Sequence, residues 1–207
     1  MPAVDLVLAS ASPARLALLR AAGIEPTVIV SDVDEDAVTA EIGADEPEVL
    51  VAALARAKAE AVTARLDPTV GPTVVLGCDS LFAFGDRTWG KPTDAADAVA
   101  RIRAMREQEG VLHTGHHLID TRDQRFVHAV AATTVRFGPM SDSEIDAYVA
   151  TGEPLRVAGS FTLDGRSAPW VEGVVGDHTN VIGLSLPTLR DLLGRMEMSV
   201  VDLWDAP

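Results

Sequence analysis

Short apolar runs of strand length alternate with segments that have helical spacing, and this alternation constrains the fold more than any other feature. The runs at residues 4–9 and 73–77 are almost entirely apolar, which is typical of buried strands. Two longer runs, at 113–120 and 125–137, are joined by a polar turn and predict two strands. Strand–helix alternation early in the chain, with a long hairpin in the middle, predicts an α/β fold with a mixed sheet.

Helix caps and turn residues predict the remaining elements. Ser12 and Pro13 are typical of an N-cap and a first helical residue, and Gly23 of a helix stop. A capping box at 141–144 opens a helix that Gly152 closes. We also expect helices at 47–66, 93–107 and 186–196, strands at 27–31, 161–163 and 170–175, and a hairpin around 85–87. The chain has 207 residues and no repeat or linker, so we expect one domain over 1–207, with up to two lobes.

Charge and composition exclude several classes of protein. The 31 acidic and 17 basic residues give a net charge of −14, which repels nucleic acids and anionic membranes. No apolar run approaches the ~18 residues of a membrane-spanning helix. Residues 1–5 lack the basic region of a signal peptide, and the single Cys78 cannot form an internal disulfide. We therefore expect a soluble cytoplasmic protein that binds neither nucleic acid nor membrane.

The segment from Ser10 to Arg15 is the first candidate site. A strand runs directly into a helix whose first turn carries the hydroxyls of Ser10 and Ser12 and the guanidinium of Arg15. The free N–H groups and the dipole of a helix N-terminus favour an anion such as phosphate. The alternative is an ordinary capped helix with a solvated arginine.

Asp79 is the second candidate, because it directly follows a buried strand. Ligands of open α/β sheets bind outside the carboxyl ends of strands, where a carboxylate can act as a general base or bind a divalent cation. The alternative is an aspartate that caps a turn. Cys78 continues the apolar run and is better explained as a small buried hydrophobe than as a nucleophile.

Residues 85–92 nearly match the phosphate-binding pattern G-x-x-x-x-G-K-[ST]. Pro92 replaces the hydroxyl residue that would hold magnesium, and it has no N–H, so we reject a P-loop. Lys91 can bind a phosphate by itself or lie in solvent.

Two further clusters are less specific. The acidic run at 32–36 follows a predicted strand and either holds magnesium or forms a solvated loop. His113 and His117 face one side of a strand and His116 the other, and no cysteine or carboxylate nearby completes a zinc site.

The order of these motifs resembles the opening signature and later motifs of the Maf family of nucleotide pyrophosphatases. The resemblance covers nearly the whole chain. It is carried by Leu8-Ala9-Ser10-x-Ser12-Pro13-x-Arg15, Gly23-Ile24, Ser31-x-Val33-x-Glu35, Ala55-x-Ala57-Lys58-Ala59, Asp79-Ser80, Gly90-Lys91-Pro92, Gly152-Glu153-Pro154, Ala158-Gly159 and Gly176-x-x-x-Asn180-Val181-x-Gly183-Leu184.

The resemblance implies a mixed, elongated sheet flanked by helices, two lobes around a deep cleft, and a homodimer. It implies hydrolysis of nucleoside triphosphates between the α- and β-phosphates, with a divalent cation such as Mg²⁺ or Mn²⁺ as cofactor. Asp79 matches the proton acceptor, and Glu35 and Asp79 are the expected metal ligands. The residues expected to line the cleft and bind substrate phosphates are Ser10, Ser12, Arg15, Lys58 and Lys91.

Three positions depart from the best-known family pattern, namely Ala14, Ser80 and Asp164. In the family, Arg, Thr and Gln at these positions accompany cleavage of dTTP and UTP. We therefore expect a nucleotide pyrophosphatase that is not confined to those two substrates and that clears modified or non-standard nucleotides. The alternative is a nucleotide-binding regulator of cell division with little turnover.

Overall fold

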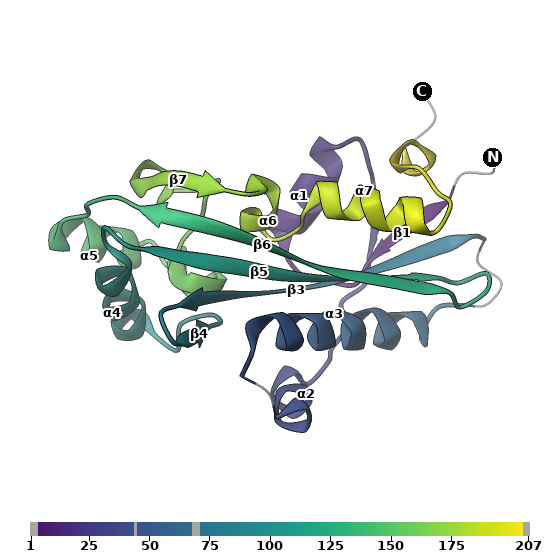
Figure 1. Cartoon of the computed structure of the whole chain (residues 1–207), viewed down its shortest axis with the longest axis horizontal. Coiled ribbons are helices and arrows are strands. Elements are labelled where there is room, and N and C mark those ends of the chain that lie inside the picture. The colour runs from purple at the N-terminus through teal and green to yellow at the C-terminus, as the bar shows by residue number, and fades with distance from the viewer. Residues whose placement is uncertain (1–3, 44, 68–70, 205–207) are drawn as a thin grey trace.

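The protein is built on a mixed seven-stranded sheet flanked by helices, as expected from the sequence (Figure 1). The computed structural model describes residues 4–43, 45–67 and 71–204. Within these ranges the strand order is β2-β1-β3-β5-β6-β7, with β4 paired to β3; β1 is parallel to β2 and β3, and the other pairs are antiparallel. The strands are β1 (Asp5–Leu8), β2 (Thr27–Val28), β3 (Thr73–Phe84), β4 (Arg87–Trp89), β5 (Glu109–Asp120), β6 (Phe126–Phe137) and β7 (Val171–Val175).

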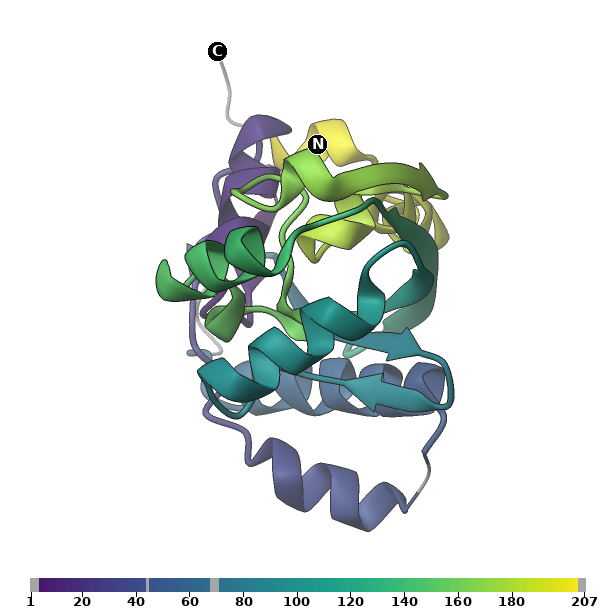
Figure 2. The ribbon, with the colours of Figure 1, turned by 90° about the vertical axis from the view of Figure 1, so that its left-hand side faces the viewer.

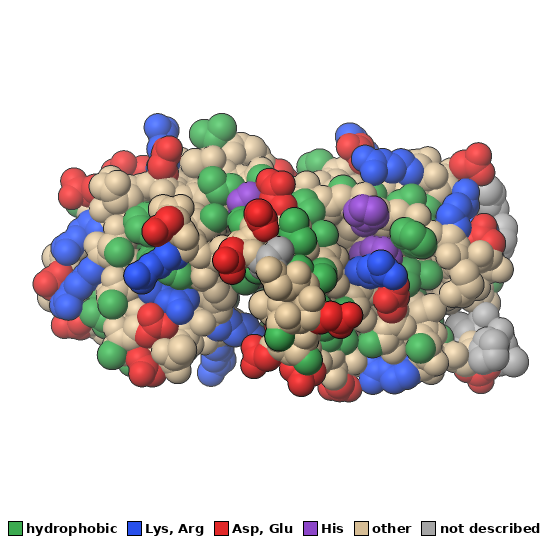
Figure 3. Space-filling view, turned by 60° about the horizontal axis from the view of Figure 1, so that its bottom comes forward, with side chains coloured by type: hydrophobic (Ala, Val, Ile, Leu, Met, Phe, Trp, Pro, Cys, Tyr) green, Lys and Arg blue, Asp and Glu red, His purple; other side chains and the backbone are tan. Residues whose placement is uncertain are grey.

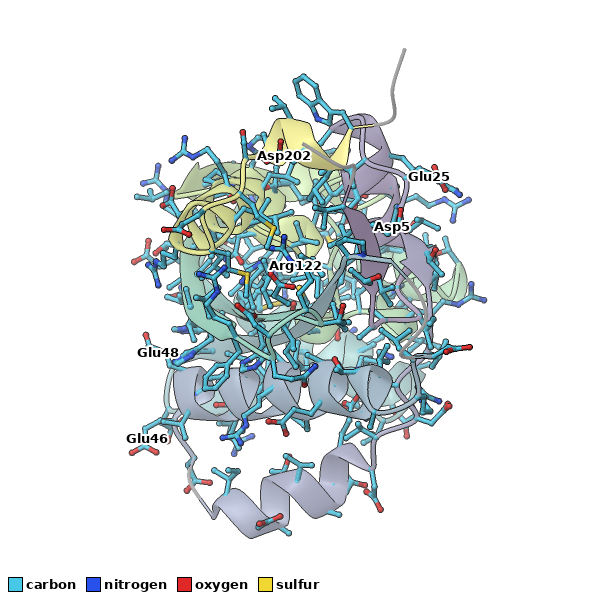
Figure 4. The ribbon with its side chains drawn as sticks, turned by 90° about the vertical axis from the view of Figure 1, so that its right-hand side faces the viewer. Asp5, Glu25, Glu46, Glu48, Arg122 and Asp202 are labelled. Atoms are coloured by element: carbon cyan, nitrogen blue, oxygen red, sulfur yellow. The ribbon has the colours of Figure 1, made fainter. Side chains whose placement is uncertain are left out.

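Helices cover both faces of this sheet. The α-helices of the described residues are α1 (Pro13–Ala21), α2 (Glu35–Ile42), α3 (Pro47–Thr63), α4 (Ala95–Met105), α5 (Asp142–Ala150), α6 (His178–Ile182) and α7 (Leu186–Arg195). In Figure 1, α3 lies against one face, and α1, α6 and α7 lie against the other. Figures 2 and 4 show α2 beyond α3, on the side away from the sheet; Glu46 and Glu48, labelled in Figure 4, lie where α3 begins. None of the described helices is long and apolar enough to cross a membrane.

Two glycines allow α3 to lie unusually close to the sheet. A Cβ atom at Gly77 of β3 would lie 2.1 Å from the carbonyl oxygen of Ala55, and one at Gly115 of β5 would lie 2.1 Å from that of Val51. Both distances are far below any contact a carbon atom tolerates, so the helix backbone rests directly on the two strands. This close packing places the α3 side chains within reach of the middle of β3.

The buried side chains form separate cores along the length of β3. One core joins β1 and the first half of β3 to α1 and α7, and it includes Leu8, Leu76 and Leu192. Another surrounds Phe82 near the end of β3 and joins it to α4 and α5, with Met105 among its members. Figure 3 shows a gap between the two halves of one face of the molecule.

Between these two cores, one edge of β3 has no neighbouring strand. On that edge β1 pairs with residues 73–76 of β3, and β4 pairs with residues 82–84. β5 occupies the opposite edge from Val74 to Ala83. Residues 77–81 are therefore flanked by a strand on one side only, and we call them the open edge.

The position of Asp79 differs from the prediction. The sequence predicted a strand at 73–77 that ends just before Asp79, but β3 continues to Phe84 because β5 pairs with it from Val74 to Ala83. Asp79 lies in the middle of a long strand, within the open edge. The strand that ends beside it is β1, whose last paired residue is Leu8.

Three other predictions need correction. The strand at 27–31 contains only Thr27–Val28, because its partner β1 ends at Leu8. Residues 161–163 form no strand: the N–H of Thr162 donates to Ser167 Oγ, inside a loop. Only part of the acidic run at 32–36 is a loop. The Asp34 carboxylate accepts a hydrogen bond from Ala37 N and caps α2, so the last two residues of the run are helical. The sequence predicts no signal peptide from residues 1–5, of which residues 1–3 lie outside the described part of the chain.

The close approach of α3 predicts the effect of Gly115→Ala. The added Cβ would collide with helix backbone, so we expect the free energy of unfolding to fall by about 1–3 kcal/mol. Gly194→Ala is the control, because Gly194 is an exposed residue of α7 with nothing within 4 Å of an added Cβ, and it should be neutral or slightly stabilising. Urea titrations of both variants measure the difference; equal stabilities would contradict this packing.

Candidate active site

The side chain of Asp79 points from the open edge toward α3 and meets Lys58. Lys58 Nζ lies 2.5 Å from Asp79 Oδ1, and both side chains are about nine-tenths buried. α3 presents Lys58 on its sheet-facing side, beside the buried Ala55 and Ala59. Lys58 Nζ also lies 2.7 Å from Oε1 of Glu35, the first residue of α2, whose side chain is 55% exposed. One ammonium group therefore lies between two carboxylates on different elements.

Burial and charge act in opposite directions on Asp79. Removal from water raises the pKa of its carboxyl group above the ordinary value of 3.8, and the positive charges of Lys58 and Arg15 only partly offset this. A carboxylate with a raised pKa accepts a proton more readily than one in water. The arrangement therefore suits a general base.

The same two carboxylates could bind a divalent cation. Carboxylate oxygens are the ligands that Mg²⁺ and Mn²⁺ prefer, and those of Glu35 and Asp79 converge on one point. The described residues contain no group of three His, Cys, Asp or Glu side chains that could hold a metal. These two residues therefore fit a metal that takes its remaining ligands from water and from a bound anion, as magnesium commonly does.

Arg15 lies at the same open edge, and protein groups bind most of its N–H groups. Its Nε donates to the carbonyl of Gly183 (2.7 Å). Its Nη1 donates to Ser10 Oγ (3.0 Å) and to the carbonyl of Cys78 (2.9 Å), which has no strand partner there. Its Nη2 donates to Ser80 Oγ (3.0 Å). Four of the five guanidinium N–H groups are thus used, and the residue is only 8% exposed.

The N-terminus of α1 offers fewer free donors than the sequence suggested. Pro13 at the first helical position has no N–H, and Ser12 Oγ accepts from Arg15 N. Ser10 Oγ accepts from Ser12 N as well as from Arg15. Within the first helical turn, the Ala14 N–H is left without a partner among the described residues. The structure does bring together Ser10, Ser12 and Arg15, but these residues largely form hydrogen bonds with one another.

Lys91 borders the other end of the open edge. It follows Gly90, whose carbonyl accepts from Gly159 N and from Arg101 Nη1, so its backbone is held in place. Its side chain is exposed and forms no ion pair with any residue that the structure describes. Lys91 is thus a free positive charge, unlike Lys58 and Arg15.

The three positions that depart from the family pattern have different surroundings. Ser80 is half-buried and bonded to Arg15, and Ala14 is half-buried on α1. Asp164 is exposed on the loop between Thr162 and Ser167, without a hydrogen bond or ion pair to the described residues. Glu153, which the sequence analysis named only as part of the Gly152-Glu153-Pro154 motif, anchors this loop by accepting from Thr162 Oγ1 (2.7 Å) and Arg166 N (2.8 Å).

The histidines of β5 divide between the two faces of the sheet as predicted. His113 lies 3.6 Å from Glu48 on the α3 side. On the other face, Ser185 N donates to His116 Nε2, and His116 Nδ1 bonds to the carbonyl of Thr114, which fixes the tautomer with its proton on Nδ1. Burial lowers the pKa of His116 to about 4, so the ring is neutral at pH 7.

A buried carboxylate–lysine pair at an interrupted strand edge gives this mixed α/β protein a candidate catalytic site. Comparison with known proteins agrees with this class. Residues 5–196 match the sequence model of a family described as Maf-like protein. The chain belongs to this family.

Several relatives are similar over almost their full length. A protein of Streptomyces avermitilis is 54% identical over 98% of this chain and 96% of its own. A protein of Salinispora tropica is 52% identical over 96% of this chain and 87% of its own length. A protein of Trichormus variabilis is 47% identical over 99% of this chain and 100% of its own length. Each of the three is named nucleoside triphosphate pyrophosphatase.

The buried pair predicts the effect of Lys58→Met. The Asp79 carboxylate would remain buried without its partner, so we expect the free energy of unfolding at pH 7 to fall by about 2–4 kcal/mol. Adding Asp79→Asn should recover part of this loss. The matched control is Arg56→Met, because the Arg56–Glu60 pair has a similar length (2.7 Å) but is exposed, and it should cost less than ~1 kcal/mol. Chemical denaturation measures these variants together with the Asp79→Asn single variant. If the effects of Lys58→Met and Asp79→Asn simply add in the double variant, the two residues are not coupled.

Proposed function

We propose that this protein is a nucleoside triphosphate pyrophosphatase that releases a nucleoside monophosphate and diphosphate. The observation that carries the proposal is the buried Asp79–Lys58 pair at the open edge of β3, with the free Lys91 nearby in the fold. The names of the relatives, at about 50% identity over almost the whole chain, support the same activity.

In the proposed reaction, a water oxygen attacks the α-phosphorus and its proton passes to the Asp79 carboxylate. The bond between the α-phosphorus and the bridging oxygen breaks, and the bridging oxygen leaves with the diphosphate. Lys58 keeps Asp79 ionised before the attack and holds one of its oxygens, so that the other is left to accept the proton. The contact of Lys58 Nζ with only one Asp79 oxygen supports this proposed division of roles.

The proposed role of the basic residues is to offset the negative charge of the triphosphate. The protein has a net charge of −14, so a polyanion needs a local concentration of positive charge. Lys91 is the side chain with the most freedom to bind phosphate oxygens, since no described residue neutralises it. Lys58 is shared between two carboxylates, and Arg15 has one N–H left.

We further propose that the activity depends on a divalent cation held by Glu35 and Asp79. When bound, such a cation would withdraw charge from the phosphoryl oxygens. Lys58 now bonds to both carboxylates, so a cation that replaced it at Glu35 would leave Lys58 with a donor for phosphate while its bond to Asp79 is kept.

Asp79→Asn tests the role of the base. Asparagine has nearly the same shape but accepts no proton, so we expect kcat to fall by ~10²–10⁴ while the fold is retained. In the wild type, kcat/KM should decline at acidic pH because Asp79 becomes protonated, with the midpoint above 3.8 since burial raises its pKa. Near-normal turnover by a folded Asp79→Asn variant would remove this residue from the role. A protein that only bound nucleotide would release no diphosphate from any nucleotide.

Hydrolysis in ¹⁸O-labelled water tests which bond breaks. We expect the label in the nucleoside monophosphate, because water attacks the α-phosphorus. Label in orthophosphate would show γ-phosphate cleavage instead. Treatment with EDTA followed by Mg²⁺ or Mn²⁺ serves as the control for metal dependence and should abolish and then restore diphosphate release.

The proposed substrate range extends beyond dTTP and UTP. Ala14, Ser80 and Asp164 replace the residues that accompany those substrates in the family, and a mismatched hydrogen bond shifts preference by roughly tenfold to a hundredfold. The measurement is kcat/KM for dTTP, UTP, CTP and GTP. A tenfold preference for dTTP and UTP over the other two would contradict the proposal.

A further inference from the structure

Residues 30–34 connect β2 to α2, and we call this segment the strap. None of its residues is buried, and none belongs to a helix or strand. The next residue is Glu35, whose carboxylate lies 2.7 Å from Lys58 Nζ, and the helix that Glu35 begins has no buried side chain. Apolar packing therefore contributes little to the position of this carboxylate, which leaves polar contacts to fix it.

Arg65 makes two such contacts with the strap. Its Nη2 donates to the carbonyl of Val30, and its Nη1 donates to Asp32 Oδ2 (3.1 Å). Arg65 lies two residues beyond the end of α3 and seven residues after Lys58, a spacing of about two helical turns. One side of α3 therefore holds both ends of the segment 30–35, with Arg65 at its beginning and Lys58 at its end.

The strap needs such support at Asp32. The backbone of this residue has a φ of 55°, in the left-handed region that side chains with a Cβ atom rarely adopt. The bond from Arg65 to the Asp32 carboxylate favours this conformation over the extended ones that an unattached strap would adopt. The course of the chain between Val30 and Glu35 therefore depends on Arg65.

We infer that Arg65 is a positioning residue, which places the Glu35 carboxylate for binding the divalent cation. The inference rests on the proposed function, in which Glu35 and Asp79 hold that cation. Asp79 is buried in the middle of β3, so its position does not depend on the strap. The Glu35 side chain is 55% exposed, and its position depends on the strap that leads to it.

The importance of Arg65 increases when the cation binds. In this structure the strap segment is held at both ends, by Arg65 and by the contact between Lys58 and Glu35. When Glu35 binds a cation in place of Lys58, that second contact is lost, and the bonds from Arg65 continue to hold the strap against α3. Arg65 therefore supports the affinity for the cation without touching the cation or the substrate.

Arg65→Met tests this role through the Mn²⁺ affinity of the protein. The dissociation constant is measured without nucleotide, from the electron paramagnetic resonance signal of free Mn²⁺, for the ion that Asp79→Asn releases. We expect Arg65→Met to raise this constant by about threefold to tenfold; the effect is modest because the Arg65 and Asp32 side chains are 44% and 74% exposed. Arg65→Gln replaces Arg65→Met if the latter aggregates.

The matched control is Arg56→Met. Arg56 lies on α3 and forms an exposed ion pair with Glu60 (2.7 Å), away from the strap. Both variants remove one positive charge, which by itself favours the binding of a cation. Arg56→Met should therefore leave the Mn²⁺ constant within twofold of the wild type or lower it, whereas Arg65→Met should raise it, against the electrostatic effect.

Two further variants show whether Arg65 acts through Glu35. In the Glu35→Gln background, Arg65→Met should change the Mn²⁺ constant by less than twofold, because the carboxylate that Arg65 positions is already absent. Arg65→Lys keeps the charge and a donor for one of the two strap contacts, so it should keep more of the affinity than Arg65→Met does. A residue that only stabilised the fold would show neither pattern.

Three results would overturn the inference: Arg65→Met binds Mn²⁺ as tightly as the wild type, Arg56→Met weakens binding equally, or the effect of Arg65→Met persists in the Glu35→Gln background. The proposed function can fail separately. If the wild type binds Mn²⁺ at Asp79 but releases no diphosphate from any nucleotide, the proposed function fails and the Mn²⁺ constants still decide the role of Arg65. If Asp79→Asn releases no Mn²⁺, the cation site and the inference both fail.

Discussion

The interruption along one edge of β3 is the constraint on which the rest of this structure depends. A strand in the middle of a sheet normally pairs on both sides, and a buried carbonyl without a partner costs about 1–3 kcal/mol. Here β1 stops at Leu8 and β4 starts only opposite Phe82, so the Cys78 carbonyl needs another donor. Arg15 supplies it from α1. A single side chain thus takes the place of the missing strand for this carbonyl.

The charges at this edge also depend on a single side chain, Lys58, which contacts two carboxylates. Lys58 reaches Asp79 because Gly77 and Gly115 let α3 approach the sheet, and the same lysine meets Glu35 of α2. One cation and two anions leave a net negative cluster in an acidic protein. Such a cluster favours a divalent cation, and a bound cation would in turn favour an anionic substrate.

The sequence predicts the elements of this fold well wherever the local pattern decides the structure. Ser12 and Pro13 start α1, and the capping box starts α5, as expected. The prediction fails where the length of a strand depends on its partner. β3 continues past Asp79 only because β5 is long enough to pair with it. The family resemblance predicts Asp79, Lys58 and Lys91 as site residues, but it cannot show what each one touches. The burial of Arg15 and the loop contacts of Glu153 depend on residues that are distant from them in the chain.

The placement of Glu35 at the start of α2 has a consequence for the dynamics of the site. α2 has no buried side chain, so its local unfolding requires far less free energy than unfolding of the sheet. Each such opening would remove one of the two carboxylates from Lys58 while β3 and α3 stay intact. The charge around Lys58 thus depends on whether α2 is folded, and the hydrogen-exchange rate of α2 amides would report how often Lys58 loses its Glu35 partner.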